Sequence, residues 1–223
     1  MSVHDDVIRA NAVARPRFRG VLHTWCFAAS LPAGIALVAS APTGRSAFAA
    51  WIFAFSTTAM LGISALFHRT TFDDHGWYRF RRLDHVGIYL CIAGGFTPIG
   101  MLILDGWQRP LLLVSGWVGA SLGILLRFLP YRPPFGMMNA LFIVLGWMPI
   151  LTGPALWHEL DHTAVLWMGF GGLLYTVGAL VVGSRWPDPW PRTFGYHEIW
   201  HTFVFLAATT HYVVMAVVII PRG

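Results

Sequence analysis

The sequence predicts an all-α integral membrane protein in which seven transmembrane helices form one bundle. Hydrophobic residues make up 56% of the 223 residues and charged residues only 11%, a balance that argues against a soluble fold. The charged residues also divide the chain into seven nearly uncharged stretches. Each is about 20 residues long, the length with which an α-helix crosses about 30 Å of hydrocarbon while satisfying its own backbone hydrogen bonds.

Each stretch has its own boundaries in the charge pattern. In chain order, the stretches are 20–40, 46–67, 83–104, 110–129, 135–157, 163–183 and 195–220. The first is too long for the apolar core of a signal peptide and lacks a small-residue cleavage site, so we expect it to be retained as a helix. An arginine-rich segment, residues 69–82, separates the second from the third. The fourth begins after Arg109, residues 158–162 precede the sixth, and residues 184–194 precede the seventh.

The connections between these stretches are too short for a second domain. Residues 1–19 are therefore expected to form a short cytoplasmic N-terminal segment, and residues 20–220 a single seven-helix membrane domain. We expect kinks at the prolines inside the stretches, because proline removes a helical hydrogen bond. These prolines are Pro32, Pro98, Pro149 and Pro154.

The arginines predict the orientation in the plasma (inner) membrane, because basic residues gather in cytoplasmic connections. Twelve of the fifteen arginines lie in the N-terminal segment and in alternate connections after it, against three in the opposite set, Arg45, Arg109 and Arg222. The N-terminus is therefore predicted to be cytoplasmic and the C-terminus outside. The basic balance is explained by topology and by anionic lipid head groups, so we expect no nucleic-acid partner.

Polar residues converge at the predicted cytoplasmic ends of three helices. Ser64 and His68 end the second helix, Asp84 begins the third, and His197 and His201 begin the seventh. A spacing of four residues places two side chains on one helical face about 6 Å apart along the axis, so the pair on the seventh helix can bind one ion. Both cysteines, by contrast, lie inside apolar stretches, so histidine and carboxylate are the available metal ligands.

Three histidines predict a zinc site with an open fourth position, which is the pattern of catalytic zinc. Zinc lowers the pKa of a water in that position to about 7. We expect Asp84 to orient or deprotonate this water and Ser64 to donate a hydrogen bond in the same site. The alternatives are that these histidines are hydrogen-bonded packing residues and that Asp84 forms an interfacial ion pair with its neighbouring arginines.

Two segments, 158–162 and 197–201, also match the H-E-x-x-H signature of zinc proteases. No acidic third ligand follows Glu198, and the Leu104-Asp105-Gly106 sequence lies at the opposite membrane face, so a protease is disfavoured. His158 and His162 are predicted to be solvated loop residues. His85 and His211 are expected to lie outside the zinc site, the latter as a partner in an interhelical hydrogen bond.

At these residues the chain resembles the hemolysin III family, the bacterial branch of the progestin and adipoQ receptor superfamily. The matching motifs are Ser64-x-x-x-His68, Arg82-Leu-Asp84-His-x-x-Ile-Tyr, Gly171-Gly-x-x-Tyr175 and Gly195-Tyr-His197-Glu-Ile-Trp-His201. The resemblance implies a seven-helix fold and a cytoplasm-facing Zn2+ bound by His68, His197 and His201. It also implies that Asp84 binds this zinc through water and that Ser64 lies in the same pocket.

Adiponectin receptors and the more distant alkaline ceramidases share this pattern and are associated with zinc-dependent hydrolysis of ceramide amides. The resemblance therefore implies a zinc-dependent hydrolase of a lipid amide or ester, with a membrane lipid as substrate or ligand. One alternative is a non-enzymatic sensor or regulator of membrane lipid state with structural zinc. A second alternative, raised by the family name, is a pore-forming cytolysin, although the sequence shows neither a secretion signal nor weakly inserted helices.

Overall fold

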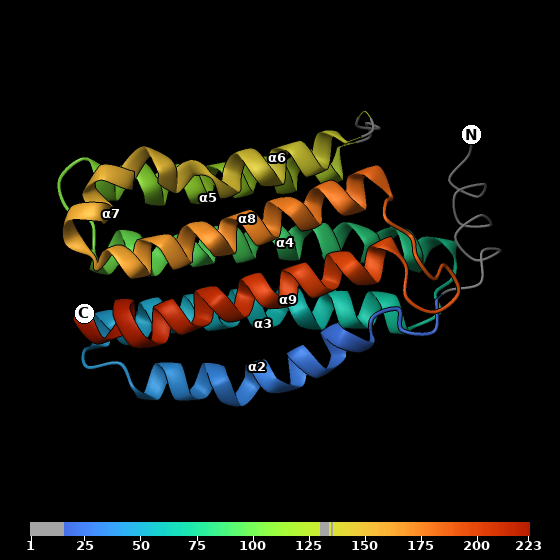
Figure 1. The fold of residues 1–223 in the computed structure, drawn as a ribbon, viewed down its shortest axis with the longest axis horizontal. Coiled ribbons are helices and arrows are strands. Elements are labelled where there is room, and N and C mark those ends of the chain that lie inside the picture. The colour runs from blue at the N-terminus through green and yellow to red at the C-terminus, as the bar shows by residue number, and fades with distance from the viewer. Residues whose placement is uncertain (1–15, 130–133, 135) are drawn as a thin grey trace.

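The computed structural model describes residues 16–129, 134 and 136–223 and contains seven helical spans that are long and apolar enough to cross a membrane (Figure 1). The spans are α2 (Val21–Ala39), α3 (Gly44–Arg69), α4 (Asp74–Leu102), α5 (Gln108–Phe128), an interrupted helix that begins with α6, α8 (His162–Ser184) and α9 (Tyr196–Val214). The predicted all-α, seven-helix fold is confirmed. Most of the predicted N-terminal segment and the predicted start of the fifth helix at Phe135 lie outside the described residues.

Helices that are consecutive in the chain pack side by side, and the last of them returns to the first. α3 contacts α2 and α4, α5 contacts α4, and α9 contacts both α8 and α2 (Figure 1). The bundle is therefore a closed ring in which α9 lies between α8 and α2. Small residues make the tightest approach, since a Cβ on Gly94 of α4 would lie 2.0 Å from Ser56 Oγ on α3, the kind of contact that brings membrane helices together.

The outer surface of the ring is apolar, as contact with lipid requires. Large apolar side chains are exposed along six of the seven described spans, whereas α4 is the most buried and exposes only Leu83 among its large apolar residues. Those on the other six spans include Trp25, Ile35, Phe55, Val114, Leu122, Val144, Leu166, Leu173 and Val217. Buried apolar side chains fill the interior from the other side of the same helices. The chain is thus an integral multi-pass membrane protein.

The third span begins nine residues earlier than the sequence predicted. α4 starts at Asp74, not at Leu83, because Asp73 caps it by accepting a hydrogen bond from the Gly76 N–H at 2.8 Å. With 29 residues, the helix is about 44 Å long and extends beyond the hydrocarbon. Charged residues are tolerated in that extension, where the Arg81 guanidinium lies over the ring of Trp77. The predicted long connection at 69–82 is therefore mostly helix.

Two of the four prolines at which kinks were predicted interrupt the fifth span, whereas α2 and α4 continue as helices through Pro32 and Pro98. α6 (Met137–Gly146) is followed by the 3-10 helix η1 (Met148–Thr152) and by α7 (Gly153–Glu159), and Pro149 and Pro154 stand near the starts of the last two. Neither proline has an N–H to continue an α-helical ladder. α9 also changes geometry near its end, where it continues as the π-helix η2 (Met215–Ile219) and the 3-10 helix η3 (Ile220–Arg222).

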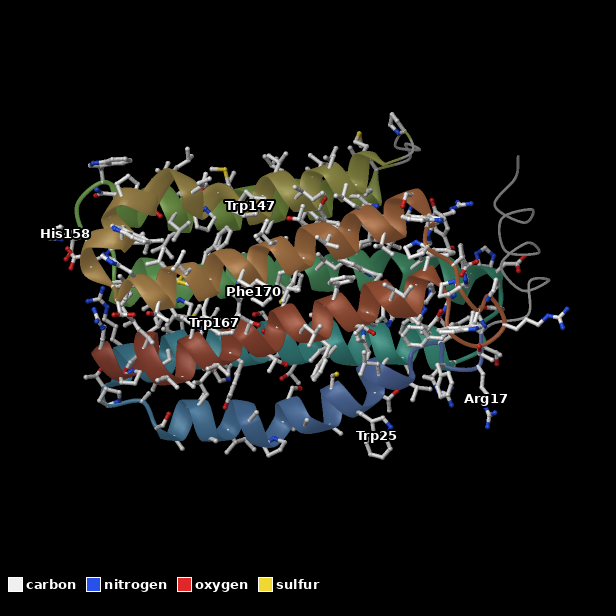
Figure 2. The ribbon with its side chains drawn as sticks, viewed as in Figure 1. Arg17, Trp25, Trp147, His158, Trp167 and Phe170 are labelled. Atoms are coloured by element: carbon white, nitrogen blue, oxygen red, sulfur yellow. The ribbon has the colours of Figure 1, made fainter. Side chains whose placement is uncertain are left out.

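The connection between the fifth and sixth spans is short, and its last residue, Asp161, caps the start of α8. The Asp161 side chain accepts a hydrogen bond from the Thr163 N–H at 2.8 Å, which satisfies one of the free donors at the start of α8. Hydrogen bonds from Thr163 hold the pKa of Asp161 below its usual range. This end of the bundle also carries His158, whereas Arg17 and Trp25 lie toward the opposite end (Figure 2).

Candidate metal centre

The ends of α3 and α9 bring the three predicted ligands together. His68 lies in the last turn of α3, and His197 and His201 lie in the first two turns of α9, at the same end of the bundle (Figure 1). The side chains of His68 and His201 are buried, and that of His197 is half-buried. Because α3 and α9 run in opposite directions, the end of one meets the start of the other.

An ion pair and a helix cap fix the start of α9. Glu198 is buried, and its Oε2 atom accepts a hydrogen bond from the Gly195 N–H at 2.8 Å. Its Oε1 atom accepts one from Arg19 Nε at 2.5 Å, which joins the residues before α2 to α9. The capping carboxylate in the first turn also opposes the positive end of the helix dipole. These contacts hold the turn that presents His197.

A glycine allows α2 to approach the end of α3. Gly20 has φ +75°, a left-handed conformation that favours glycine. A Cβ built on Gly20 would lie 2.7 Å from the Cβ of His68. The backbone before α2 therefore lies directly against one of the three ligands, and its shape contributes to the position of that side chain.

The distances among the three imidazoles suit one tetrahedral zinc ion. Zn–N distances of 2.0–2.1 Å at the tetrahedral angle place two ligand atoms about 3.3 Å apart, and His68 Nε2 and His197 Nε2 are 3.2 Å apart. Within the described part of the chain, the ligand atoms of His68, His197 and His201 all lie within 4.8 Å of one another. The residues present fit a three-histidine cation site.

The predicted acid and hydroxyl lie beside this site. Ser64 is buried one turn before His68 on α3, and its hydroxyl lies near the Asp84 carboxyl group on α4. Arg81 and Arg127 are cations near the same carboxyl group. Ser64, Asp84 and His201 all line one internal cavity. Both predicted residues thus face the space that adjoins the histidines.

This cavity has a volume of about 290 Å³ and runs along the inside of the ring. Its walls come from α2, α3, α4, α6, α8 and α9, and beyond the polar end they are predominantly apolar. His201 and Met215 both line it, and fourteen residues of helix span about 21 Å. The space therefore combines a polar end at the histidines with a long apolar interior.

The structure adds a fourth histidine that the sequence analysis did not identify. His23, in the first turn of α2, stacks on His201 with ring centroids 3.8 Å apart and planes within 4° of parallel. It also lines the cavity. The sequence signal that was available is its position near the start of the first helix, at the same predicted membrane face as the three ligands.

The other histidines considered from the sequence, His85, His158, His162 and His211, lie outside the cluster, as predicted. His158 and His162 are exposed, but they were wrongly predicted to be loop residues, since they lie at the end of α7 and the start of α8. His85 Nδ1 is 2.7 Å from the Arg81 carbonyl oxygen, and His211 Nε2 is 3.2 Å from the Met168 carbonyl oxygen on α8, an interhelical contact. His158 is exposed at the other end of the bundle (Figure 2), where it pairs with Glu159 at 3.3 Å. His162 stacks on the Trp157 ring.

These observations define a class of protein, a seven-helix membrane protein with converging histidines and an internal apolar cavity. The family model described as Haemolysin-III related matches residues 11–212. The chain belongs to this family, and the resemblance noted from the motifs is confirmed.

Relatives from bacteria and animals share parts of the chain. It is 33% identical over 125 residues to "Hemolysin-3" of Bacillus cereus, with 56% of this chain and 54% of the relative covered. It is 28% identical over 181 residues to "Adiponectin receptor protein" of Drosophila melanogaster (72% and 40%). It is 27% identical over 168 residues to "Monocyte to macrophage differentiation factor" of Homo sapiens (73% and 67%). The chain spans about half the length of the Bacillus relative.

Proposed function

We propose that the protein is a zinc-dependent hydrolase of a membrane lipid amide or ester, with Zn2+ held by His68, His197 and His201. The observation that carries the proposal is the cavity, which places Ser64, Asp84 and His201 at one end of a long apolar space. A lipid has the same division into a polar acyl linkage and a hydrocarbon chain. Ligand pockets of this size, with a few polar groups in an apolar wall, are typical binding sites.

The residues of the site divide the chemistry among them. When bound, zinc supplies a Lewis acid and lowers the pKa of a coordinated water to about 7. The Asp84 carboxylate accepts a proton from the attacking water and returns it to the nitrogen or oxygen of the leaving group, while the acyl C–N or C–O bond breaks. Ser64 donates a hydrogen bond that orients Asp84. The products are a fatty acid and an amine or alcohol.

The apolar walls supply binding and positioning. The acyl chain of a membrane lipid already lies in hydrocarbon, so walls of the same polarity accept it without a desolvation cost and hold it by packing contacts. A chain held along α9 places its acyl carbon at the polar end. Such positioning converts hydrolysis into an effectively unimolecular step.

A non-enzymatic lipid sensor is the second candidate. The observation that favours it is that the three histidines come from α3 and α9, so one ion would join two helices that are far apart in the sequence. In that case zinc is structural, and the cavity binds lipid without cleaving it. Loss of Asp84 would then leave membrane lipids unchanged.

Lipid analysis with matched variants separates the two candidates. Membranes that contain wild-type protein are expected to accumulate fatty acid and the corresponding amine or alcohol, and Asp84→Asn is expected to reduce the rate about 10²-fold to 10⁴-fold while retaining zinc. The control is Asp105→Asn, because Asp105 is exposed at the other end of the bundle and pairs with Arg109. If both wild type and Asp84→Asn bind zinc yet give identical lipid profiles, the hydrolase proposal fails for the lipids surveyed.

A further inference from the structure

Neither nitrogen of the buried His23 imidazole forms a hydrogen bond of normal length among the described residues. The backbone of His201 is near enough to interact with one of them, so at least one nitrogen has no partner. The residue is 2% exposed. A buried polar atom without a partner costs about 1–3 kcal/mol, and a phenylalanine would stack on His201 without that cost. The imidazole at this position therefore indicates a partner that the protein chain itself does not provide.

The location of His23 identifies where that partner lies. The side chain lines the same cavity as Ser64, Asp84 and His201. Its nitrogens are covered, but the ring lies against His201, so an oxygen atom held beside the His201 imidazole would lie next to it. A histidine ring nitrogen can donate or accept a hydrogen bond according to its tautomer. It is therefore suited to a carbonyl or hydroxyl oxygen of an acyl head group.

The stacked geometry argues against His23 as a fourth metal ligand. An imidazole nitrogen binds a metal through a lone pair in the plane of its ring. The rings of His23 and His201 are nearly parallel and their centroids are 3.8 Å apart, so a cation in the plane of His201 lies about one ring spacing outside the plane of His23. His23 is accordingly absent from the group of converging ligand atoms.

We propose that His23 is a further functional residue of the site, with two roles. Its ring face holds the plane of the His201 imidazole, and one of its nitrogens forms a hydrogen bond with the oxygen of the acyl group beside the cation. The inference rests on the proposed function, because it uses the same cation and the same lipid-binding cavity. It assigns to α2 a direct part in substrate recognition.

Cobalt in place of zinc gives a test with a readout other than hydrolysis. Purified protein is loaded with Co(II), and acetohydroxamate, a small acyl oxyanion, is titrated while the visible absorption of the cobalt is recorded. His23→Phe keeps an aromatic ring against His201 and removes the nitrogens. We expect it to bind one cobalt with the wild-type spectrum and to bind acetohydroxamate about tenfold more weakly, the size of one lost hydrogen bond.

A second variant tests the stacking role, and a third is the matched control. His23→Ala removes the ring that faces His201, so we expect a changed cobalt spectrum and weaker cobalt binding. His162→Phe removes another stacked imidazole, which lies against the Trp157 ring at the other end of the bundle and outside this cavity, and should behave as wild type in both measurements. An unchanged cobalt spectrum and affinity in His23→Ala would overturn the stacking role.

The outcomes distinguish failure of this inference from failure of the proposed function. Wild-type acetohydroxamate affinity in His23→Phe overturns the hydrogen bond, and loss of cobalt from His23→Phe would make His23 a ligand and overturn the assignment. If wild-type protein binds no more cobalt than His68→Ala, the metal site itself fails. If cobalt and acetohydroxamate bind as expected but no lipid is cleaved, hydrolysis fails while the recognition role of His23 stands.

Discussion

Glu198 is a structural carboxylate, although it occupies the position of the general base in an H-E-x-x-H sequence. Its two oxygens are engaged by Arg19 Nε and by the Gly195 N–H, so neither is free to receive a proton from water. We expect Glu198→Gln to lower the free energy of unfolding by about 1–3 kcal/mol, because the variant leaves the partly buried Arg19 cation without its counterion. Thermal unfolding of the detergent-solubilised protein measures this change.

The matched control for that variant is Glu159→Gln. Glu159 belongs to the other H-E-x-x-H sequence, and its exposed side chain pairs with exposed His158. Surface pairs of this kind contribute about 0–1 kcal/mol, so the melting temperature should not change measurably. Equal effects of the two substitutions would contradict a special structural role for Glu198.

The sequence predicted that His68, His197 and His201 converge, because their positions follow from local rules. The spacing of His197 and His201 fixes them on one helical face, and counting spans from the arginine pattern brings His68 to the same membrane face. No local rule of this kind identifies His23 as part of the site. Its significance depends on contact between α2 and α9, the first and last spans, and a single histidine in an apolar stretch has no spacing that identifies a partner.

The turn before α2 contributes to the position of the histidine cluster. We expect Gly20→Ala to weaken zinc binding, because the new methyl group would lie 2.7 Å from the Cβ of His68 and must displace it. Alanine at φ +75° also costs about 1–2 kcal/mol in backbone strain. Zinc affinity by competition with a chelator, compared with the melting temperature, separates the two effects.

Gly136 provides the control for backbone strain alone. It has φ +80°, and a Cβ built there meets nothing within 4 Å. Gly136→Ala should therefore show a similar backbone cost with wild-type zinc affinity. If the two variants bind zinc equally well, the approach of Gly20 to His68 does not position the ligand.

The contact between α8 and α9 also depends on a missing side chain. A Cβ on Gly178 would lie 2.6 Å from Trp200 Cε3 and 2.8 Å from the Cβ of Phe203. We expect Gly178→Val to destabilise the protein by about 1–3 kcal/mol, because overpacking forces neighbouring helices apart. Gly169→Val on the same helix meets open space and should unfold near the wild-type temperature. Equal melting temperatures for the two valine variants would show that the close approach is not required.

Helix boundaries were predicted well where a helix ends with its apolar stretch. They were predicted poorly where a helix extends beyond the hydrocarbon into polar sequence. The first span was predicted at 20–40 and is found at Val21–Ala39, since both ends coincide with the limits of an apolar stretch. α4 differs because its first turns, with Arg79, Arg81 and Arg82, extend beyond the predicted apolar stretch. The charge pattern marks the edge of the hydrocarbon, whereas α4 begins earlier, at its N-terminal cap, Asp73.

The two ends of the helical bundle carry different functional groups. One end carries the histidine cluster, Ser64 and Asp84, and the other carries α7 and the exposed His158 (Figure 2). The arginine count of twelve against three predicts that the histidine end faces the cytoplasm. This assignment determines from which compartment a cation and water would reach the histidine cluster.

Cysteine labelling tests the orientation. In a chain whose Cys26 and Cys91 are replaced by alanine, His158→Cys and Thr193→Cys place single thiols at opposite ends of the bundle, both on exposed residues. A membrane-impermeant maleimide added to intact spheroplasts is expected to label His158→Cys and to label Thr193→Cys only after lysis. The reverse pattern would place the histidine cluster outside. Zinc and water would then reach Asp84 from the extracytoplasmic side, and the arginine bias would reflect contact with anionic head groups of the outer leaflet.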